Sequence, residues 1–167
     1  MTVARFEQPW RTAGRRLAVA APRLDEAWLE AARPLLAELA GGLDVYAGGR
    51  STGARVACRT SAALGVRGVV CLAFPLHPPG RPDRSRAAEL LAPSAPRLVL
   101  QGSRDTFGGP DEVRSAVGET AGVVVVELPG ADHGYRVAAA ADFTPADLRE
   151  RLVAEVAGFL GAAAIPG

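Results

Sequence analysis

The stretch LDVYAGGRSTGARV, residues 43–56, decides the fold that we expect for this chain. Residues 43–47 have the pattern of a short strand, and residues 52–64 form a run of small residues typical of a helix. Between them, Gly49-Arg50-Ser51-Thr52-Gly53 has the form G-x-S-x-G. A strand, a tight turn and a helix in direct succession are the context in which this motif carries a nucleophilic serine.

The turn predicts a role for each of its residues. It holds Ser51 in a strained backbone conformation at the carboxyl end of the strand, with the hydroxyl directed outward. The backbone amide of Thr52 lies at a helix N-terminus, where it can donate to a developing oxyanion. We expect both Gly49 and Gly53 to be required, because a Cβ atom at either position would clash with neighbouring backbone.

Short apolar runs alternate with helical segments along the rest of the chain. The predicted strands are residues 3–7, 43–47, 66–74, 98–100 and 122–128. The predicted helices are residues 24–39 (with Pro34 inside), 52–64, 86–91, 110–119 and 145–161, and residues 8–23 and 75–82 are predicted loops. This alternation favours parallel pairing. We therefore expect an α/β fold, a single domain over residues 1–167 with a mostly parallel sheet of about five strands flanked by helices.

Two polar side chains follow the ends of later predicted strands. Asp105 ends the sequence Gly102-Ser103-Arg104-Asp105, and His133 ends Gly130-Ala131-Asp132-His133. The carboxyl ends of parallel strands meet at one edge of the sheet, where open α/β sheets build their sites. A serine hydroxyl needs a base such as imidazole, and the imidazole needs a carboxylate to orient it. The sequence therefore predicts a catalytic triad of Ser51, His133 and Asp105.

Each of these residues also has a simpler interpretation. Ser51 can be an ordinary turn serine, Asp105 a turn cap, and His133 a surface loop residue. Asp132, one residue before the histidine, is a rival carboxylate that we expect to shape the turn.

Further residues are candidates for the substrate pocket. His77 lines the pocket or belongs to a proline-flanked loop, and both alternatives stay open. Arg50 and Arg55 bind an anionic substrate group or pair with a carboxylate such as Glu7 or Asp44. Phe107, like Phe74 and Tyr135, walls a pocket or packs in the core.

Composition excludes several classes of function. The net charge is +1, so no bulk field favours nucleic acid or an anionic membrane. The longest apolar stretch, residues 66–76, is far shorter than the ~20 residues that span a bilayer. Cys58 and Cys71 lie in apolar runs and are predicted to be small buried residues. All 19 basic residues are arginine, which suggests a GC-rich, bacterial genome. We expect a cytoplasmic protein without cofactor or metal.

The chain resembles the α/β-hydrolases. Within that superfamily it is similar to proteins related to dienelactone hydrolase, and most closely to the hydrolase-like family that includes testis-expressed protein 30. The matching blocks are residues 3–7, 48–57, 71–80, 101–108 and 130–133. The resemblance implies that Ser51 is the nucleophile, Asp105 the acid and His133 the base. It implies no particular substrate.

Two functions are consistent with this pattern. The first is a serine hydrolase that cleaves an ester, thioester or lactone of a small molecule. The alternative is a non-catalytic hydrolase-like scaffold or interaction protein. A fluorophosphonate probe, which labels an activated serine, distinguishes them.

The resemblance also predicts that the beginning of the fold is missing. In the α/β-hydrolases, a further strand and a glycine-containing oxyanion loop precede the part matched here. Without that loop the Thr52 amide is the single expected oxyanion donor, and we expect weak activity. We expect residues 3–7 to pair directly with residues 43–47 or to lie partly unpaired, which would favour self-association through the incomplete sheet.

Overall fold

A computed structural model describes residues 1–15, 19–39, 41–137 and 143–162. The chain divides into two compact units, Met1–Leu43 and Asp44–Gly167. The predicted triad residues all belong to the second unit.

The first unit consists of two helices and an extended N-terminal segment. The helices are α1 (Pro9–Thr12) and α2 (Ala21–Leu39). Part of the predicted loop 8–23 is therefore helical, because Pro9 fits the first turn of α1. Pro34 lies inside α2, which begins three residues before the predicted start.

The predicted strand at residues 3–7 is wrong. The segment contains no strand and pairs with none of the described strands. Its side chains alternate as in a strand, but Val3 is 67% exposed and Phe6 packs on Trp28, with ring centroids 5.6 Å apart. Alternation makes a strand only where a neighbouring backbone supplies hydrogen bonds.

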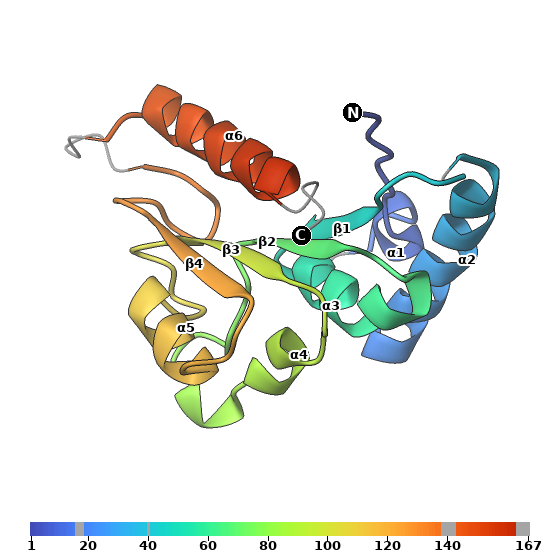
Figure 1. Cartoon of the computed structure of the whole chain (residues 1–167). Helices are drawn as coiled ribbons and strands as arrows, with labels where there is room; N and C mark the ends of the chain where they lie inside the picture. The colour runs from blue at the N-terminus through green and yellow to red at the C-terminus, as the bar shows by residue number, and fades with distance from the viewer. Residues whose placement is uncertain (16–18, 40, 138–142, 163–167) are drawn as a thin grey trace. The chain divides into compact units, whose positions relative to one another are not determined.

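The second unit is built on a parallel sheet of four strands (Figure 1). The strands are β1 (Tyr46–Arg50), β2 (Gly68–Leu72), β3 (Arg97–Gly102) and β4 (Val123–Leu128). Their order, β1-β2-β3-β4, follows the sequence, and each pairs in parallel with the next. The predicted α/β class with a parallel sheet is confirmed, with four strands instead of about five.

Helices cover both faces of this sheet (Figure 1). α6 (Pro145–Ala162) lies over one face. The other face carries α3 (Thr52–Leu64), α4 (Ala87–Leu91) and α5 (Pro110–Val117), with a 3₁₀ turn at Pro82–Arg84 before α4. This arrangement leaves the loops that follow the carboxyl ends of the strands free to form a site.

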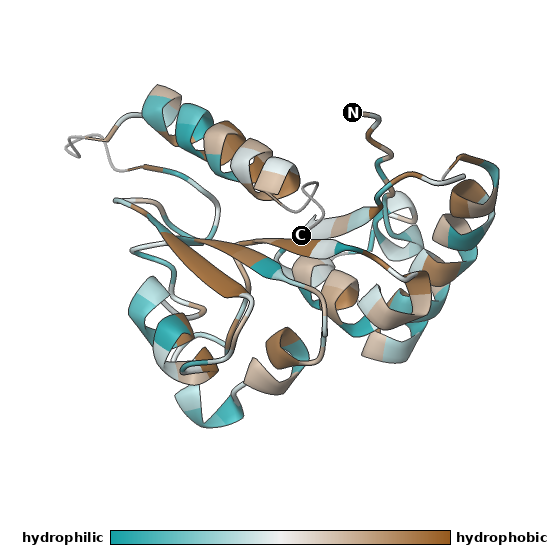
Figure 2. Cartoon of the chain, in the orientation of Figure 1, coloured by the Kyte–Doolittle hydropathy of each residue, from teal (hydrophilic) through white to brown (hydrophobic). Residues whose placement is uncertain are grey.

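Side chains of the central strands alternate between two apolar cores. Val69, Cys71 and Val99 belong to the core under α3, α4 and α5. Leu98 and Leu100 face the core under α6. Figure 2 shows the resulting apolar colour along the strands between more hydrophilic helices.

Cys58 and Cys71 are both buried, as predicted, with their Sγ atoms 3.5 Å apart. In the described part of the chain, no helix combines the length and the apolar character needed to cross a membrane.

Candidate active site

The turn between β1 and α3 holds Ser51 in the strained conformation that the sequence predicts. Its φ of 53° and ψ of −116° lie outside the regions that side chains with a Cβ atom prefer. The Ser51 amide donates to the Leu72 carbonyl at 2.9 Å, which fixes the turn against the end of β2. β1 itself starts and ends three residues later than predicted and runs to Arg50. The serine therefore follows the last strand residue directly.

The two glycines of the motif are not equivalent. A Cβ atom at Gly49 would lie 2.4 Å from the backbone carbon of Gly53, so Gly49 is required. A Cβ atom at Gly53 would meet nothing within 4 Å. The prediction that both glycines are required is thus wrong for Gly53, because this residue faces open space from the first turn of α3.

The structure brings Ser51, His133 and Asp105 together. The Nε2 atom of His133 lies 2.8 Å from Ser51 Oγ, and its Nδ1 atom lies 2.8 Å from Asp105 Oδ2. Because an ionised carboxylate only accepts, the Nδ1–H group donates to Asp105 and leaves Nε2 free to accept from the Ser51 hydroxyl. Asp105 follows β3 and His133 follows β4, at the same edge of the sheet as the turn after β1.

The Asp105 side chain is fully buried and accepts hydrogen bonds at both oxygens. Oδ1 accepts from the Phe107 amide at 2.8 Å, and Oδ2 accepts from Nε2 of Gln101 at 3.0 Å as well as from His133. Gln101 had no predicted role, although it lies in a block that resembles the hydrolases. The sequence signal was an amide side chain directly after the apolar residues 98–100.

Further side chains hold the loop that carries His133. The Phe107 ring lies against the imidazole, with centroids 4.2 Å apart and an angle of 30° between the planes. Arg50 donates from Nη2 to the His133 carbonyl at 2.9 Å, and its guanidinium lies 5.8 Å from the centre of the Tyr135 ring. The Tyr135 hydroxyl donates to the Leu100 carbonyl, and burial raises the pKa of this phenol. These contacts fix the orientation of the histidine loop.

Asp132 closes the turn around the histidine, as expected. Its Oδ1 atom accepts from the amides of Gly134 at 2.7 Å and Arg136 at 2.9 Å. These backbone hydrogen bonds, the one from Arg136 first, lower the pKa of Asp132.

A family model described as an alpha/beta hydrolase domain matches residues 1–161. This chain belongs to that alpha/beta hydrolase family. No curated protein matches it.

Solved structures share the fold of this alpha/beta hydrolase. An alpha-beta serine hydrolase homologue from Coxiella burnetii has 20% identity and a TM-score of 0.63, over 86% of this chain and 62% of that one. A lidless alpha/beta serine hydrolase from Xanthomonas campestris has 20% identity and a TM-score of 0.62, over 87% and 61%. A thermophilic esterase from Thermogutta terrifontis has 15% identity and a TM-score of 0.62, over 89% and 75%. The chain therefore spans about three fifths of the length of the first two relatives.

In this alpha/beta hydrolase, His77 belongs to loop structure and is not in the triad. It is 6% exposed, with Nδ1 2.9 Å from the Pro78 carbonyl oxygen and Nε2 3.2 Å from a Glu112 carboxylate oxygen. A backbone hydrogen bond from Gly109, together with the His77 contact, lowers the pKa of Glu112. Both ring nitrogens of His77 thus have partners within the fold, and its place in a substrate pocket stays a prediction.

The arginine partners differ from those predicted. Arg55 pairs with Glu89 on α4 at 2.6 Å, and Arg59 binds the same carboxylate. Glu7 and Asp44, the carboxylates named in the prediction, pair with Arg11 and Arg67. Arg55 and Arg59 lie four residues apart on α3, so their side chains project from the same face of the helix. Both therefore reach the Glu89 carboxylate on α4.

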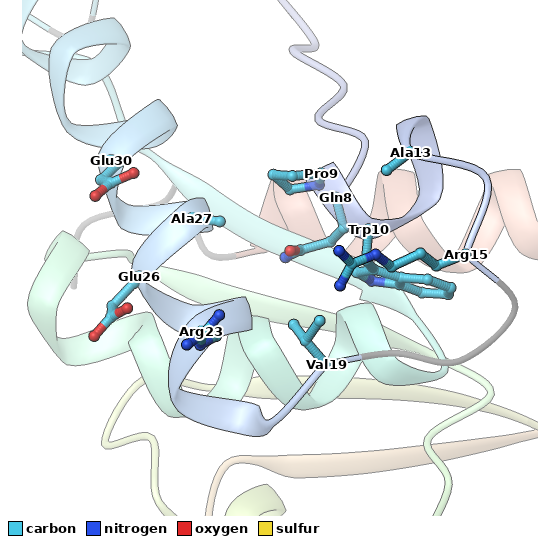
Figure 3. A pocket seen from close by; sticks show the side chains of 10 residues that line it. All are labelled: Gln8, Pro9, Trp10, Ala13, Arg15, Val19, Arg23, Glu26, Ala27 and Glu30. Atoms are coloured by element: carbon cyan, nitrogen blue, oxygen red, sulfur yellow. The ribbon is translucent and has the colours of Figure 1, made fainter.

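A separate cavity of about 550 Å³ lies in the first unit (Figure 3). Ten described residues line it, among them Gln8, Trp10 and Arg15 on one side and Glu26 and Glu30 on α2. No histidine, serine or cysteine is among those ten residues, so they provide no hydroxyl or thiol nucleophile and no imidazole base.

Proposed function

We propose that this chain is a serine hydrolase that cleaves an ester, thioester or lactone of a small molecule. The observation that carries the proposal is the pair of 2.8 Å contacts that link Ser51 to His133 and His133 to Asp105. Hydrogen-bond contact between nucleophile, base and orienting carboxylate is the geometric mark of such sites.

The proposed reaction has two steps. Ser51 Oγ attacks the acyl carbon while His133 Nε2 takes the hydroxyl proton. The bond from the acyl carbon to the leaving group then breaks, and His133 returns the proton to that group. Water attacks the acyl-serine by the same route, which releases the acid and restores Ser51.

The proposed supporting roles follow from position. Asp105 stabilises the imidazolium that forms on His133. The Thr52 amide, the first in α3, has no acceptor inside the helix and is the proposed oxyanion donor. Phe107 and Arg50 hold the base, and the substrate lies beside them. We also propose that the chain is related to dienelactone hydrolase and to the testis-expressed protein 30 family. Its similarity in fold to the thermophilic esterase from Thermogutta terrifontis supports the proposed reaction class.

A fluorophosphonate probe tests the proposal. The expected result is a single adduct on the Ser51 peptide in the wild-type protein, with none in Ser51→Ala. Ser61→Ala, which changes a buried serine on the same α3 helix, is the matched control and should be labelled like the wild type. A folded wild-type protein that takes up no probe would favour the non-catalytic scaffold.

A further inference from the structure

Gln101 is a fully buried polar residue near the carboxyl end of the central strand β3. Its exposed fraction is 0%, and it pairs with Glu127 on the neighbouring strand β4. Its Nε2 atom lies 3.0 Å from Asp105 Oδ2, 3.1 Å from the Phe74 carbonyl oxygen and 2.7 Å from the Gly108 carbonyl oxygen. One amide group thus joins the triad carboxylate to the ends of two loops.

The three acceptors decide the orientation of this amide. Two carbonyl oxygens and a carboxylate oxygen all need donors, so the group that faces them is the NH₂ and not Oε1. Oε1 is buried and has no hydrogen-bond partner among the described residues. A buried unpaired oxygen costs free energy that an apolar side chain of the same size would avoid. The amide is therefore not explained by packing alone.

We infer that Gln101 is a positioning residue that holds Asp105 in the rotamer that His133 requires. This inference rests on the proposed function. The carboxylate is held by three donors: His133 and Gln101 at Oδ2 and the Phe107 amide at Oδ1. The terminal torsion of an aspartate is soft, so loss of the side-chain donor lets the carboxylate rotate away from Nδ1. The two hydrogens of the Gln101 NH₂ group are shared among Asp105 Oδ2 and the Phe74 and Gly108 carbonyls, and the two carbonyls anchor Gln101 itself.

Gln101→Met tests the inference. Methionine has a similar length and volume and removes the unpaired oxygen, but it also removes the donor to the Phe74 and Gly108 carbonyls, so rates are compared per folded protein after circular dichroism. We expect Ser51 labelling by the fluorophosphonate to slow about 10- to 100-fold per folded protein, the scale of a misplaced catalytic group. The KM for p-nitrophenyl acetate should stay within about threefold, so the loss appears in kcat. Thr60→Val is the control, because Thr60 is also buried and donates to a backbone carbonyl but does not contact Asp105.

Gln101→Glu gives a second readout that a structural role would not affect. The introduced carboxyl can donate to Asp105 only while it is protonated, and a carboxylate beside it opposes its ionisation. The ratio of variant to wild-type labelling rates should fall as the pH rises from about 6 to about 9. Wild type and variant are measured at each pH, because Tyr135, whose pKa is raised by burial and less strongly by the Asp105 charge, is present in both proteins.

The outcomes separate the two proposals. Absence of Ser51 labelling in the wild type contradicts the proposed function. Labelling of the wild type at Ser51, with Gln101→Met within about twofold of it or with a Gln101→Glu ratio independent of pH, overturns the role of Gln101 and leaves the triad intact.

Discussion

The imidazole of His133 forms hydrogen bonds with Ser51 and Asp105 and lies against the Phe107 ring. Replacing His133, the proposed base, or its carboxylate partner Asp105 should therefore affect catalysis far more than folding. We expect His133→Ala and Asp105→Asn to reduce ester hydrolysis by roughly 10⁴-fold, because the base is absent or held in the wrong tautomer. Thermal melting followed by circular dichroism checks that both variants fold. Hydrolysis within a few-fold of wild type in His133→Ala would show that another group is the base.

Arg50 provides a test of positioning against substrate binding. Arg50→Met keeps the aliphatic stem and removes the donor to the His133 carbonyl. We expect kcat to fall about 3- to 10-fold for neutral and anionic esters alike, the equivalent of one lost hydrogen bond. A rise in KM confined to anionic esters would instead assign Arg50 to substrate recognition. Arg151→Met, on the exposed face of α6, is the control.

The meeting of Ser51, Asp105 and His133 was predictable because each lies at or shortly after the carboxyl end of a strand, and parallel strands bring such positions together. The contacts of Gln101, Phe107 and Arg50 were not predictable from the sequence. They depend on the rotamers that packing selects, and sequence spacing does not report rotamers. His77 shows the same limit, since its contact with Glu112 on α5 depends on packing that the local sequence does not contain.

At the level of elements, the turn from β1 into α3 tolerates a methyl group at one glycine and not at the other. Gly49→Ala would place a Cβ atom 2.4 Å from the Gly53 backbone, so we expect a loss of about 1–3 kcal/mol or more and no Ser51 labelling. Gly53→Ala should be labelled normally and gain about 0.5–1 kcal/mol, because alanine suits a helix better than glycine does. Urea denaturation and probe labelling measure both effects. Equal behaviour of the two variants would contradict the geometry of the turn.

The helices after β1 were predicted more closely than the strands. α3 has the predicted bounds, because its run of small residues ends at a glycine with a φ of 59°. β1 was predicted too early, since Gly48 and Gly49 have low intrinsic strand propensity and are held in the sheet by pairing with β2. Residues 3–7 show the reverse case, in which a strand pattern finds no partner. Strand bounds depend on neighbours that the local sequence does not contain.

Over the whole molecule, ion pairs and turn hydrogen bonds predict how stability changes with pH. Burial alone would raise the pKa of Glu89, but the hydrogen bonds from Arg55 and Arg59 outweigh it and lower the pKa. The pKa values of Glu112 and Asp132 are lowered as well. Groups whose pKa is lower in the folded state stabilise the protein above their unfolded pKa. This stability is lost as the pH falls, so the melting temperature should drop between about pH 5 and pH 3.

Glu89→Gln tests how much the ion pairs of Glu89 on α4 with Arg55 and Arg59 on α3 stabilise the fold. Since the Glu89 side chain is 23% exposed, solvent screening limits the expected loss at neutral pH to about 1–2 kcal/mol. The variant should also lose less stability than wild type on acidification. Asp111→Asn, whose side chain is 94% exposed, is the control and should leave the acid dependence unchanged. An unchanged melting temperature for Glu89→Gln across this pH range would show that these ion pairs contribute nothing to stability.

Self-association through the sheet edges stays a prediction at this scale. Each of the two outer strands, β1 and β4, pairs with one described strand only. Val124 on β4 is 53% exposed. Sedimentation velocity over a range of protein concentrations measures the association, and a single monomeric species at every concentration would exclude it.

The division into two units has a spectroscopic consequence. Both tryptophans, Trp10 and Trp28, belong to Met1–Leu43, while the unit that carries the triad has two tyrosines, Tyr46 and Tyr135, and no tryptophan. Selectively excited indole emission therefore monitors the first unit alone, and tyrosine emission monitors the second. Unfolding curves recorded in the two emission bands would coincide if the units melt as one cooperative body and separate if they do not.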